Sequence, residues 1–257
     1  MLLQCGKEHL AYAKTAGTGP GVVYLHGLMS TMDATKALFL EQHCINQGRA
    51  FIRFDYAGHG KSSSDFKDCN IGIWLNNVLV VLDELTTGPQ ILVGSSLGGW
   101  LMCLAALQRS KRIAGLLAIA ASIDFTEQSM WQNFSSEIKH ELETTGIYYM
   151  PSNYGAPYPI TMQLITEARN HLLMHNENKN GKNNKINITC PVALVHGTGD
   201  TVVPWQHSMQ IAESLTSTDV RITINKGTDH SFSNTKDLEV LGLELDRLIN
   251  QQGSLSI

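Results

Sequence analysis

Short apolar runs alternate with longer segments of helical periodicity along most of this 257-residue chain, and this alternation constrains the fold more than any other feature. The runs are rich in Val, Ile and Leu without strict alternation, which is typical of strands buried on both faces. They lie at residues 21–26, 50–55, 89–94, 115–121, 191–196 and 220–225. In the segments between these runs the apolar residues recur at helical spacing, for example over residues 71–85. The sequence therefore predicts an α/β fold with a mostly parallel central sheet flanked by helices.

The alternation stops between about Ser122 and Ile188, where helix-like segments flank the aromatic stretch 148–159 and no strand is predicted. Insertions at the carboxyl ends of parallel strands lie where such sheets bind their ligands. We therefore expect one domain over residues 1–257, with residues 122–188 forming a small helical lid. The polar tract 176–187 is expected to be a solvated loop without chemistry.

Composition limits the classes of partner. A net charge of −4 and the absence of a basic stripe argue against binding to nucleic acid. No stretch contains the run of about 18 apolar residues that a transmembrane segment needs. Five scattered cysteines without a CxxC pair indicate a reducing compartment. The amino-terminal residues resemble neither a signal nor a transit peptide, so we expect a cytoplasmic protein.

The most specific motif is Gly94-Ser95-Ser96-Leu97-Gly98, which directly follows a predicted strand and precedes a helix-like stretch. Glycines are needed there because the chain turns sharply from strand to helix and holds the serine in a strained conformation. This context makes Ser96 the candidate nucleophile. Ser95 is a poor rival, since centring the motif on it would put Val93 and Leu97 at the glycine positions.

A serine hydroxyl needs a base within hydrogen-bond reach and an acid that orients the base. His230 and Asp200 each follow a predicted strand, and the chain order of serine, acid and histidine matches this motif. We therefore predict Ser96, Asp200 and His230 as catalytic residues. Asp229, beside the histidine, and Asp124, after the strand at 115–121, stay open as weaker candidates for the acid.

The tetrahedral intermediate of acyl transfer needs two N–H donors aimed at its oxyanion. We predict the backbone N–H groups of Leu97, at the start of a helix, and of Leu28, after the strand at 21–26, as these donors. His26 precedes the nucleophile in the chain, which is the wrong order for the base. Residues 55–62 lack the spacing of a phosphate-binding loop and are interpreted as a turn in which Asp55 binds backbone groups. No coherent metal-ligand set is present, and we expect neither a metal nor a cofactor.

Apolar side chains near the motif and in the predicted lid would suit an apolar acyl group. We predict Met29, Trp131, Tyr149 and Met150 as substrate-binding residues. Further candidates in the lid are Met130, Phe134, Tyr148, Tyr154 and Tyr158. Some of these side chains are expected to pack the lid onto the core instead.

Several stretches resemble the acyl-protein thioesterase and acyl-glucuronide esterase branch of the alpha/beta-hydrolase domain family. They are residues 35–44, 51–63, 88–102, 150–154 and 196–220, which span most of the chain. The tract at 176–187 is extra relative to that family. The animal members carry a mitochondrial leader that this sequence does not show, so their location is not carried over.

The resemblance implies an alpha/beta-hydrolase fold and a serine hydrolase in which Ser96, Asp200 and His230 form the catalytic triad. It also implies acyl ester or thioester substrates, including S-acylated proteins that would be depalmitoylated through an acyl-serine intermediate. One alternative is a general carboxylesterase for small esters or acyl glucuronides. Another is a catalytically silent binding scaffold, because a fold does not fix a function.

Overall fold

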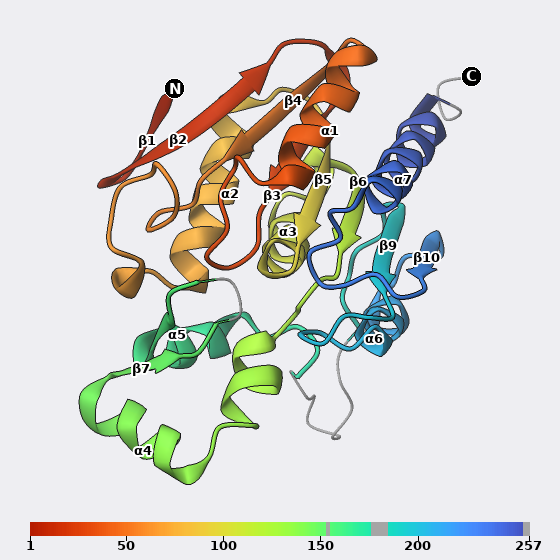
Figure 1. The fold of residues 1–257 in the computed structure, drawn as a ribbon. Coiled ribbons are helices and arrows are strands. Elements are labelled where there is room, and N and C mark those ends of the chain that lie inside the picture. The colour runs from red at the N-terminus through yellow and green to blue at the C-terminus, as the bar shows by residue number, and fades with distance from the viewer. Residues whose placement is uncertain (153–154, 176–184, 254–257) are drawn as a thin grey trace.

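An eight-stranded sheet runs through the centre of the molecule (Figure 1). The computed structural model describes residues 1–152, 155–175 and 185–253. The strand order is β1-β2-β4-β3-β5-β6-β9-β10. The strands are β1 (Leu2–Cys5), β2 (Glu8–Thr15), β3 (Thr18–Leu25), β4 (Arg49–Phe54), β5 (Gln90–Ser95), β6 (Ile113–Ile119), β9 (Val192–Gly197) and β10 (Val220–Asn225). The pairings from β4 through β10 are all parallel, whereas the β1–β2 and β2–β4 pairings are antiparallel.

The parallel strands coincide with the six apolar runs of the sequence, within three residues at each end. Every residue of β5, β6 and β9 is buried, which explains why these runs show no alternation. The mostly parallel sheet flanked by helices is therefore confirmed. β1 and β2 were not predicted from the sequence, because charged and polar residues interrupt the apolar ones in these strands at the edge of the sheet.

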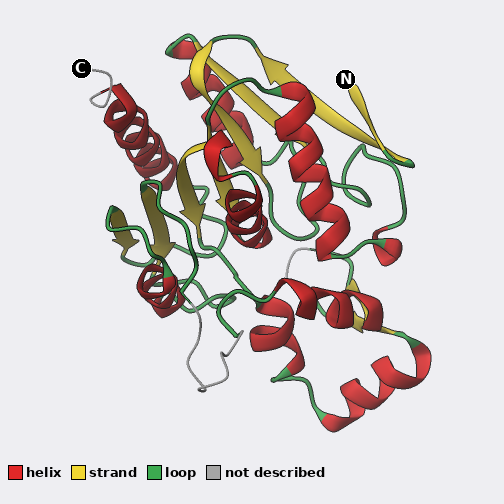
Figure 2. Ribbon diagram, turned by 180° about the vertical axis from the view of Figure 1, so that it is seen from behind, coloured by secondary structure: helices red, strands yellow, loops and turns green. Residues whose placement is uncertain are grey.

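Helices cover both faces of the sheet. The helices are α1 (Thr35–Asn46), α2 (Ile71–Leu85), α3 (Leu97–Gln108), α6 (Gln206–Ser214) and α7 (Thr235–Gly253), with short turns η1 (Phe66–Asp68) and η2 (Ser110–Arg112). α1 and α7 share one apolar cluster, which includes Leu40 and Leu245. α2, α3 and α6 share the other, on the face that Figure 2 turns toward the reader. No helix in the described ranges is long and apolar enough to cross a membrane.

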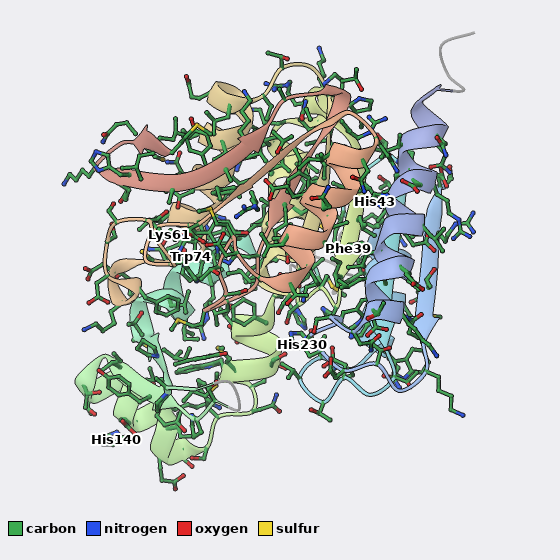
Figure 3. The ribbon with its side chains drawn as sticks, turned by 45° about the horizontal axis from the view of Figure 1, so that its top comes forward. Phe39, His43, Lys61, Trp74, His140 and His230 are labelled. Carbon is green, nitrogen blue, oxygen red and sulfur yellow. The ribbon has the colours of Figure 1, made fainter. Side chains whose placement is uncertain are left out.

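Local signals explain where individual helices begin and how they pack. α2 begins after Asn70, whose side chain accepts a hydrogen bond from the N–H of Ile73 at 3.0 Å. On the opposite face, Phe39 and His43 of α1 lie toward α7 (Figure 3), where His43 Nε2 is 2.8 Å from an Asp246 carboxylate oxygen. These helices thus cover the two faces of the sheet, and they leave the carboxyl ends of its strands uncovered for a binding site.

A separate layer follows β6 and precedes β9, below the strand ends in Figure 1. Its elements are η3 (Thr126–Trp131), α4 (Ser136–Thr145), β7 (Ile147–Met150), β8 (Tyr158–Thr161), α5 (Met162–Ala168) and η4 (Arg169–His171). We call residues 122–175 of this layer the inserted segment. Its antiparallel β7–β8 hairpin was not expected from the sequence, because each strand has only four residues. Most of the polar tract, residues 176–184, lies outside the described residues.

Asp124 joins the two ends of the inserted segment. Its buried carboxylate accepts hydrogen bonds from the backbone N–H groups of Leu173, Met174 and His175, at 2.7–3.1 Å. A carboxylate held by several N–H groups compensates for the loss of water on burial. This aspartate therefore fixes how the inserted segment leaves and rejoins the sheet.

Candidate active site

Ser96 stands on a tight turn between β5 and α3. Its backbone has φ 51° and ψ −115°, a conformation that is strained for a residue other than glycine. A side chain at Gly94 would lie 2.4 Å from the carbonyl oxygen of Gly98, and one at Gly98 would lie 2.1 Å from that of Leu25. Both glycines are thus required by close backbone approach, as predicted from the motif. The turn projects the Ser96 hydroxyl into a cavity.

The three residues that were predicted as nucleophile, base and acid lie within hydrogen-bond distance of one another. His230 Nε2 is 3.2 Å from Ser96 Oγ, and His230 Nδ1 is 2.7 Å from Asp200 Oδ2. The carboxylate can only accept, so Nδ1 carries the proton and the lone pair of Nε2 faces the serine hydroxyl. This is the tautomer that a general base acting on Ser96 requires.

Asp200 is held from several sides. Its Oδ1 accepts hydrogen bonds from the N–H groups of Val202 and Val203, both at 2.8 Å. Burial raises the pKa of the Asp200 carboxyl, but hydrogen bonds from His196 and His230 and the charge of His230 outweigh burial and hold that pKa well below its ordinary value. The carboxylate is therefore ionised at neutral pH.

His196 is a residue of this site that the sequence analysis missed. Its Nε2 lies 3.0 Å from both Asp200 Oδ2 and the carbonyl oxygen of Val203, and its Nδ1 lies 2.7 Å from Ser208 Oγ. Since both neighbours of Nε2 are acceptors, Nε2 must carry a proton and donate it. Asp200 Oδ2 thus accepts from two histidines, His196 and His230. The position of His196 within a buried strand, four residues before Asp200, was the signal available in the sequence.

The rival aspartates have other partners. Asp124 is occupied by the backbone of residues 173–175. Asp229 accepts hydrogen bonds from the N–H and hydroxyl of Ser231, at 3.0 and 2.6 Å, and stays exposed. Only Asp200, among these three candidates, contacts the imidazole of His230.

The predicted N–H donors lie close to the nucleophile. Leu28 and Leu97 both line the cavity with Ser96. Neither backbone N–H donates a hydrogen bond to another described residue. A Cβ atom on Gly27 would lie 3.3 Å from Ser96 Cβ, so the Leu28 loop approaches the nucleophile closely. The arrangement is suited to two donors for an oxyanion, and that role stays a prediction.

The loop that carries Leu28 is held by buried side chains. The N–H of Met29 donates to His59 Nε2 at 3.2 Å, and burial lowers the pKa of His59 to about 3, which keeps the imidazole neutral. Asp55 accepts from the N–H groups of Met32 and Lys61, at 2.6 and 2.8 Å. The interpretation of Asp55 as a backbone-binding residue is confirmed. His26 is fully buried, and burial lowers its pKa to about 4.

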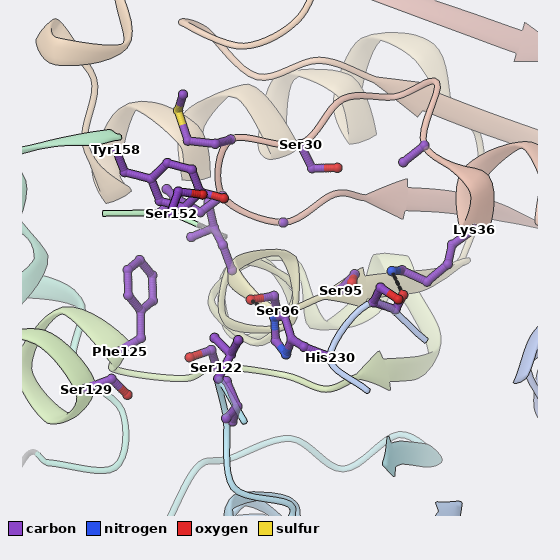
Figure 4. A pocket seen from close by; sticks show the side chains of 18 of the residues that line it. Ser30, Lys36, Ser95, Ser96, Ser122, Phe125, Ser129, Ser152, Tyr158 and His230 are labelled. Carbon is purple, nitrogen blue, oxygen red and sulfur yellow. Dashed lines mark hydrogen bonds between the residues drawn. The ribbon is translucent and has the colours of Figure 1, made fainter. Parts of the chain in front are cut away.

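A cavity of about 530 Å³ surrounds Ser96 and His230 (Figure 4). This volume falls within the range of small-molecule sites, about 300–1,000 Å³. Its walls come from the loop that carries Leu28, from α1, from the strand-to-helix turn at Ser96 (the elbow), from the inserted segment, and from the loops after β9 and β10. The large side chains that line it include Tyr24, Leu28, Met29, Lys36, Leu97, Phe125, Met130, Met150, Tyr158 and Val202. No group of His, Cys, Asp and Glu that could hold a metal is present among the described residues.

Met29 and Met150 line the cavity, but Trp131 and Tyr149 do not, so the expectation for these two residues is corrected. Neighbouring side chains of a strand point to opposite faces, and Tyr149 therefore faces solvent when Met150 faces the cavity. Trp131 instead contacts two cations: Lys139 Nζ and Arg169 Cζ lie 5.5 and 5.2 Å from its ring centroid.

Among the other candidates predicted in the lid, some line the cavity and others do not. Tyr158, together with Met130, lines the cavity. Phe134 and Tyr148 pack edge to face against each other, with ring centroids 5.7 Å apart, and do not line it. Tyr154 lies outside the described residues.

Comparisons with known proteins agree with this architecture. Residues 20–145 match the family model described as alpha/beta hydrolase fold. The chain is 39% identical over 249 residues to proteins named "Palmitoyl-protein thioesterase ABHD10, mitochondrial" from Bos taurus and Homo sapiens, covering 96% of this chain and 78% of each relative. The chain belongs to the alpha/beta hydrolase family. The fold and the family predicted from the sequence are confirmed for this hydrolase.

Solved structures extend the similarity over nearly the whole hydrolase. Alpha/beta hydrolase domain-containing protein 10 from mouse has a TM-score of 0.88 and 38% identity, covering 98% of both chains. A putative hydrolase from Agrobacterium vitis S4 has a TM-score of 0.89 and 30% identity, covering 97% of both. The inserted segment thus belongs to the shared architecture rather than to this chain alone.

Proposed function

We propose that this hydrolase cleaves thioester or carboxylic ester bonds of acyl substrates through an acyl-serine intermediate. The observation that carries the proposal is the chain of contacts from Asp200 through His230 to Ser96, which ends in a partly apolar cavity. The names of the ABHD10 relatives add thioesters of palmitoylated proteins as the substrate class.

Acylation begins when Ser96 Oγ attacks the carbonyl carbon of the substrate and its proton passes to His230 Nε2. Asp200 stabilises the imidazolium that forms and keeps the ring oriented. The backbone N–H groups of Leu28 and Leu97 donate hydrogen bonds to the oxyanion of the tetrahedral intermediate. When the intermediate collapses, the C–S or C–O bond breaks and the leaving group takes the proton from His230.

Deacylation repeats these steps with water as the nucleophile. His230 accepts a proton from water, the hydroxide attacks the acyl carbon, and Ser96 leaves with the proton that His230 returns. The free acid is released. The imidazole of His230 accepts and returns the proton in every step, so the reaction requires no cofactor.

The apolar side of the cavity is suited to the acyl group. Phe125, Met130, Met150 and Tyr158 line this side, and all four come from the inserted segment. Aromatic and thioether side chains adapt to flexible alkyl chains. In this proposal the inserted segment acts as part of the lid that the sequence predicts over residues 122–188.

Hydrolysis of p-nitrophenyl esters and S-acyl thioesters of graded chain length tests the proposal. Wild-type protein should release acid at a rate that increases with acyl length, and Ser96→Ala should lose this activity. A folded wild-type protein that binds acyl compounds without turning them over would favour the silent scaffold. Activity confined to acetyl and propionyl esters would favour the general carboxylesterase.

The cytoplasmic location expected from the sequence stays a prediction, because the curated relatives carry the word mitochondrial in their names. A carboxyl-terminal fluorescent fusion of the full chain, imaged against a mitochondrial marker, distinguishes the two compartments. Overlap with the marker would contradict the prediction.

A further inference from the structure

Ser122 lies where the chain leaves β6, beside the nucleophile. Its backbone N–H donates to the carbonyl oxygen of Ser96 at 3.1 Å. The residue lines the cavity and is only 6% exposed, and its hydroxyl makes no hydrogen bond to any described residue. Buried hydroxyl groups are normally hydrogen-bonded, so an unpaired one at the wall of a cavity points to a partner inside that cavity.

A second hydroxyl, that of Ser129 in η3, belongs to the same part of the cavity. In the view of Figure 4 the hydroxyls of Ser122 and Ser129 point toward each other beside the ring of Phe125. Ser129 lines the cavity, and its hydroxyl also has no partner among the described residues. Met130 and Tyr158 supply apolar surface on this side. The acyl side thus contains two unpaired hydroxyls among its apolar side chains.

The backbone around Ser122 is held in place from several directions. Ala120 and Asp124, two residues before and after it, have φ values of 44° and 57°, which are uncommon for residues other than glycine. The Ala120 N–H donates to the carbonyl oxygen of Val195 at 2.9 Å. The Asp124 carboxylate binds the backbone of residues 173–175. A polar group held this firmly is suited to select among substrates, because binding does not have to order it first.

The charges around the cavity limit the kind of group that the two hydroxyls can bind. Among the described residues that line it, Lys36 is the one lysine, arginine, aspartate or glutamate. Figure 4 shows Lys36 on the opposite side of Ser96 from Phe125. A charged group on the acyl chain would therefore lose water without meeting an opposite charge. A hydroxyl both donates and accepts, so it can accept a hydrogen bond from one serine and donate one to the other.

We propose that Ser122 and Ser129 form a subsite for a hydroxyl group carried by the acyl chain of the substrate. The inference rests on the proposed function and adds a substrate class to it, namely 3-hydroxyacyl thioesters and esters. The contact of Ser122 with the backbone of Ser96 places the subsite near the carbonyl end of the chain. A hydroxyl on the second carbon would lie against the reacting carbonyl, whereas one on the third carbon reaches the neighbouring wall. Both serines are thus specificity-determining residues.

Matched thioesters of N-acetylcysteamine test the subsite: octanoyl and the two enantiomers of 3-hydroxyoctanoyl. The measured quantity is the ratio of kcat/KM for each hydroxyacyl thioester to kcat/KM for the octanoyl thioester. Wild type should give a ratio of about three to thirty for one enantiomer, the range of one or two net hydrogen bonds, and a lower ratio for the other. The 8-hydroxyoctanoyl thioester, with its hydroxyl at the far end, should gain nothing, and an equal gain there would contradict the assignment.

Variants of the serines separate the subsite from a structural role. Ser122→Ala should lower the ratio about tenfold through opposite effects on the two substrates. The preferred enantiomer loses a hydrogen bond, whereas the octanoyl chain lies against a methyl group instead of an unpaired hydroxyl and reacts faster. Ser129→Ala should act in the same direction. Ser30→Ala is the matched control, because Ser30 also lines the cavity but lies on the opposite side of Ser96 in Figure 4, and it should leave the ratio unchanged.

Wild-type ratios near or below one for both enantiomers would overturn the proposal. Equal losses for all thioesters in Ser122→Ala would also overturn it, because they would show that Ser122 only supports the turn at Ser96. If wild type hydrolyses no thioester, the proposed function is wrong, and binding decides the subsite separately. Isothermal titration calorimetry should then show that one enantiomer of 3-hydroxyoctanoate binds more tightly than octanoate, and equal affinities would contradict the subsite itself.

Discussion

The sheet and the inserted segment contribute to one cavity but are built differently. Ser96 and Asp200 follow strands β5 and β9, in which every residue is buried. The inserted segment is packed less uniformly: α4 buries Leu142 alone among its ten residues, whereas α5 buries Leu164, Ile165 and Ala168. Close packing fixes side chains within narrow limits, whereas a lightly packed layer can move at lower cost. The sheet is therefore suited to hold the reacting groups, and the inserted segment to accommodate acyl chains of different size.

Asp200 and Asp124 differ from each other in the same way as the sheet differs from the inserted segment. Asp200 and Asp124 both follow a strand, and both are buried acceptors of hydrogen bonds from backbone N–H groups. Asp200 Oδ2 contacts His196 and His230, whereas both oxygens of Asp124 accept from the backbone of residues 173–175, and the histidine that Asp124 contacts, His175, belongs to the same segment. The first is placed to act in chemistry and the second to anchor the inserted segment.

The largest effect is expected from substitution of Ser96, which the sheet positions. Ser96→Ala removes the nucleophile and should lower kcat for any ester or thioester by about 10⁴- to 10⁶-fold. Ser95→Ala, one residue away on the same turn, should lower kcat by less than about tenfold, because Ser95 contacts no triad member. Burst kinetics with p-nitrophenyl esters measure both. Similar losses in the two variants would show that disturbance of the turn, and not loss of a nucleophile, causes the effect.

The two aspartates should separate activity from stability. Asp200→Asn should lower kcat about 10⁴-fold, since the amide cannot hold His230 in the required tautomer. Asp124→Asn should change kcat/KM by less than about tenfold but reduce the free energy of unfolding by about 2–3 kcal/mol, because buried N–H groups lose acceptors. Thermal unfolding and kinetics of both variants measure this. A reversed pattern, with Asp124→Asn inactive at unchanged Tm, would make Asp124 the catalytic acid.

Sequence patterns predicted the strands, and they predicted three residues that the structure brings within hydrogen-bond distance of one another, because both predictions depend on local features. Continuous apolar runs mark strands buried on both faces, and the glycines of the elbow are required by backbone contact. His196 was missed because its role depends on the folded arrangement, in which His196 and His230 both contact Asp200 Oδ2. Trp131 and Tyr149 were misassigned because aromatic composition does not tell which face of a short element meets the cavity.

His196 offers a smaller test of how tightly the sheet holds Asp200. In His196→Leu, Asp200 Oδ2 loses one of its two histidine donors, and more of its negative charge remains to stabilise the protonated form of His230. The acid limb of the pH profile of kcat/KM should therefore move to higher pH, by up to about one unit, so that activity near the limb falls up to about tenfold. His196→Gln, which restores an N–H donor, should recover part of the shift. A uniform loss at every pH would indicate only a packing defect.

The smallest expected effect concerns the inserted segment. Met130 lines the cavity and the adjacent Trp131 does not, although sequence alone favoured Trp131. Met130→Ala should enlarge the acyl side and reduce kcat/KM for octanoyl and longer esters about three- to tenfold relative to acetyl esters, because buried contacts to the chain are lost at about 0.8 kcal/mol per methylene group. Trp131→Ala is the matched control and should leave the chain-length profile unchanged, while it removes the two cation–π contacts. If Trp131→Ala alters the profile as much as Met130→Ala does, the inserted segment moves when substrate binds and brings Trp131 to the acyl chain. That result would strengthen the contrast between a sheet that stays fixed and an inserted segment that adapts.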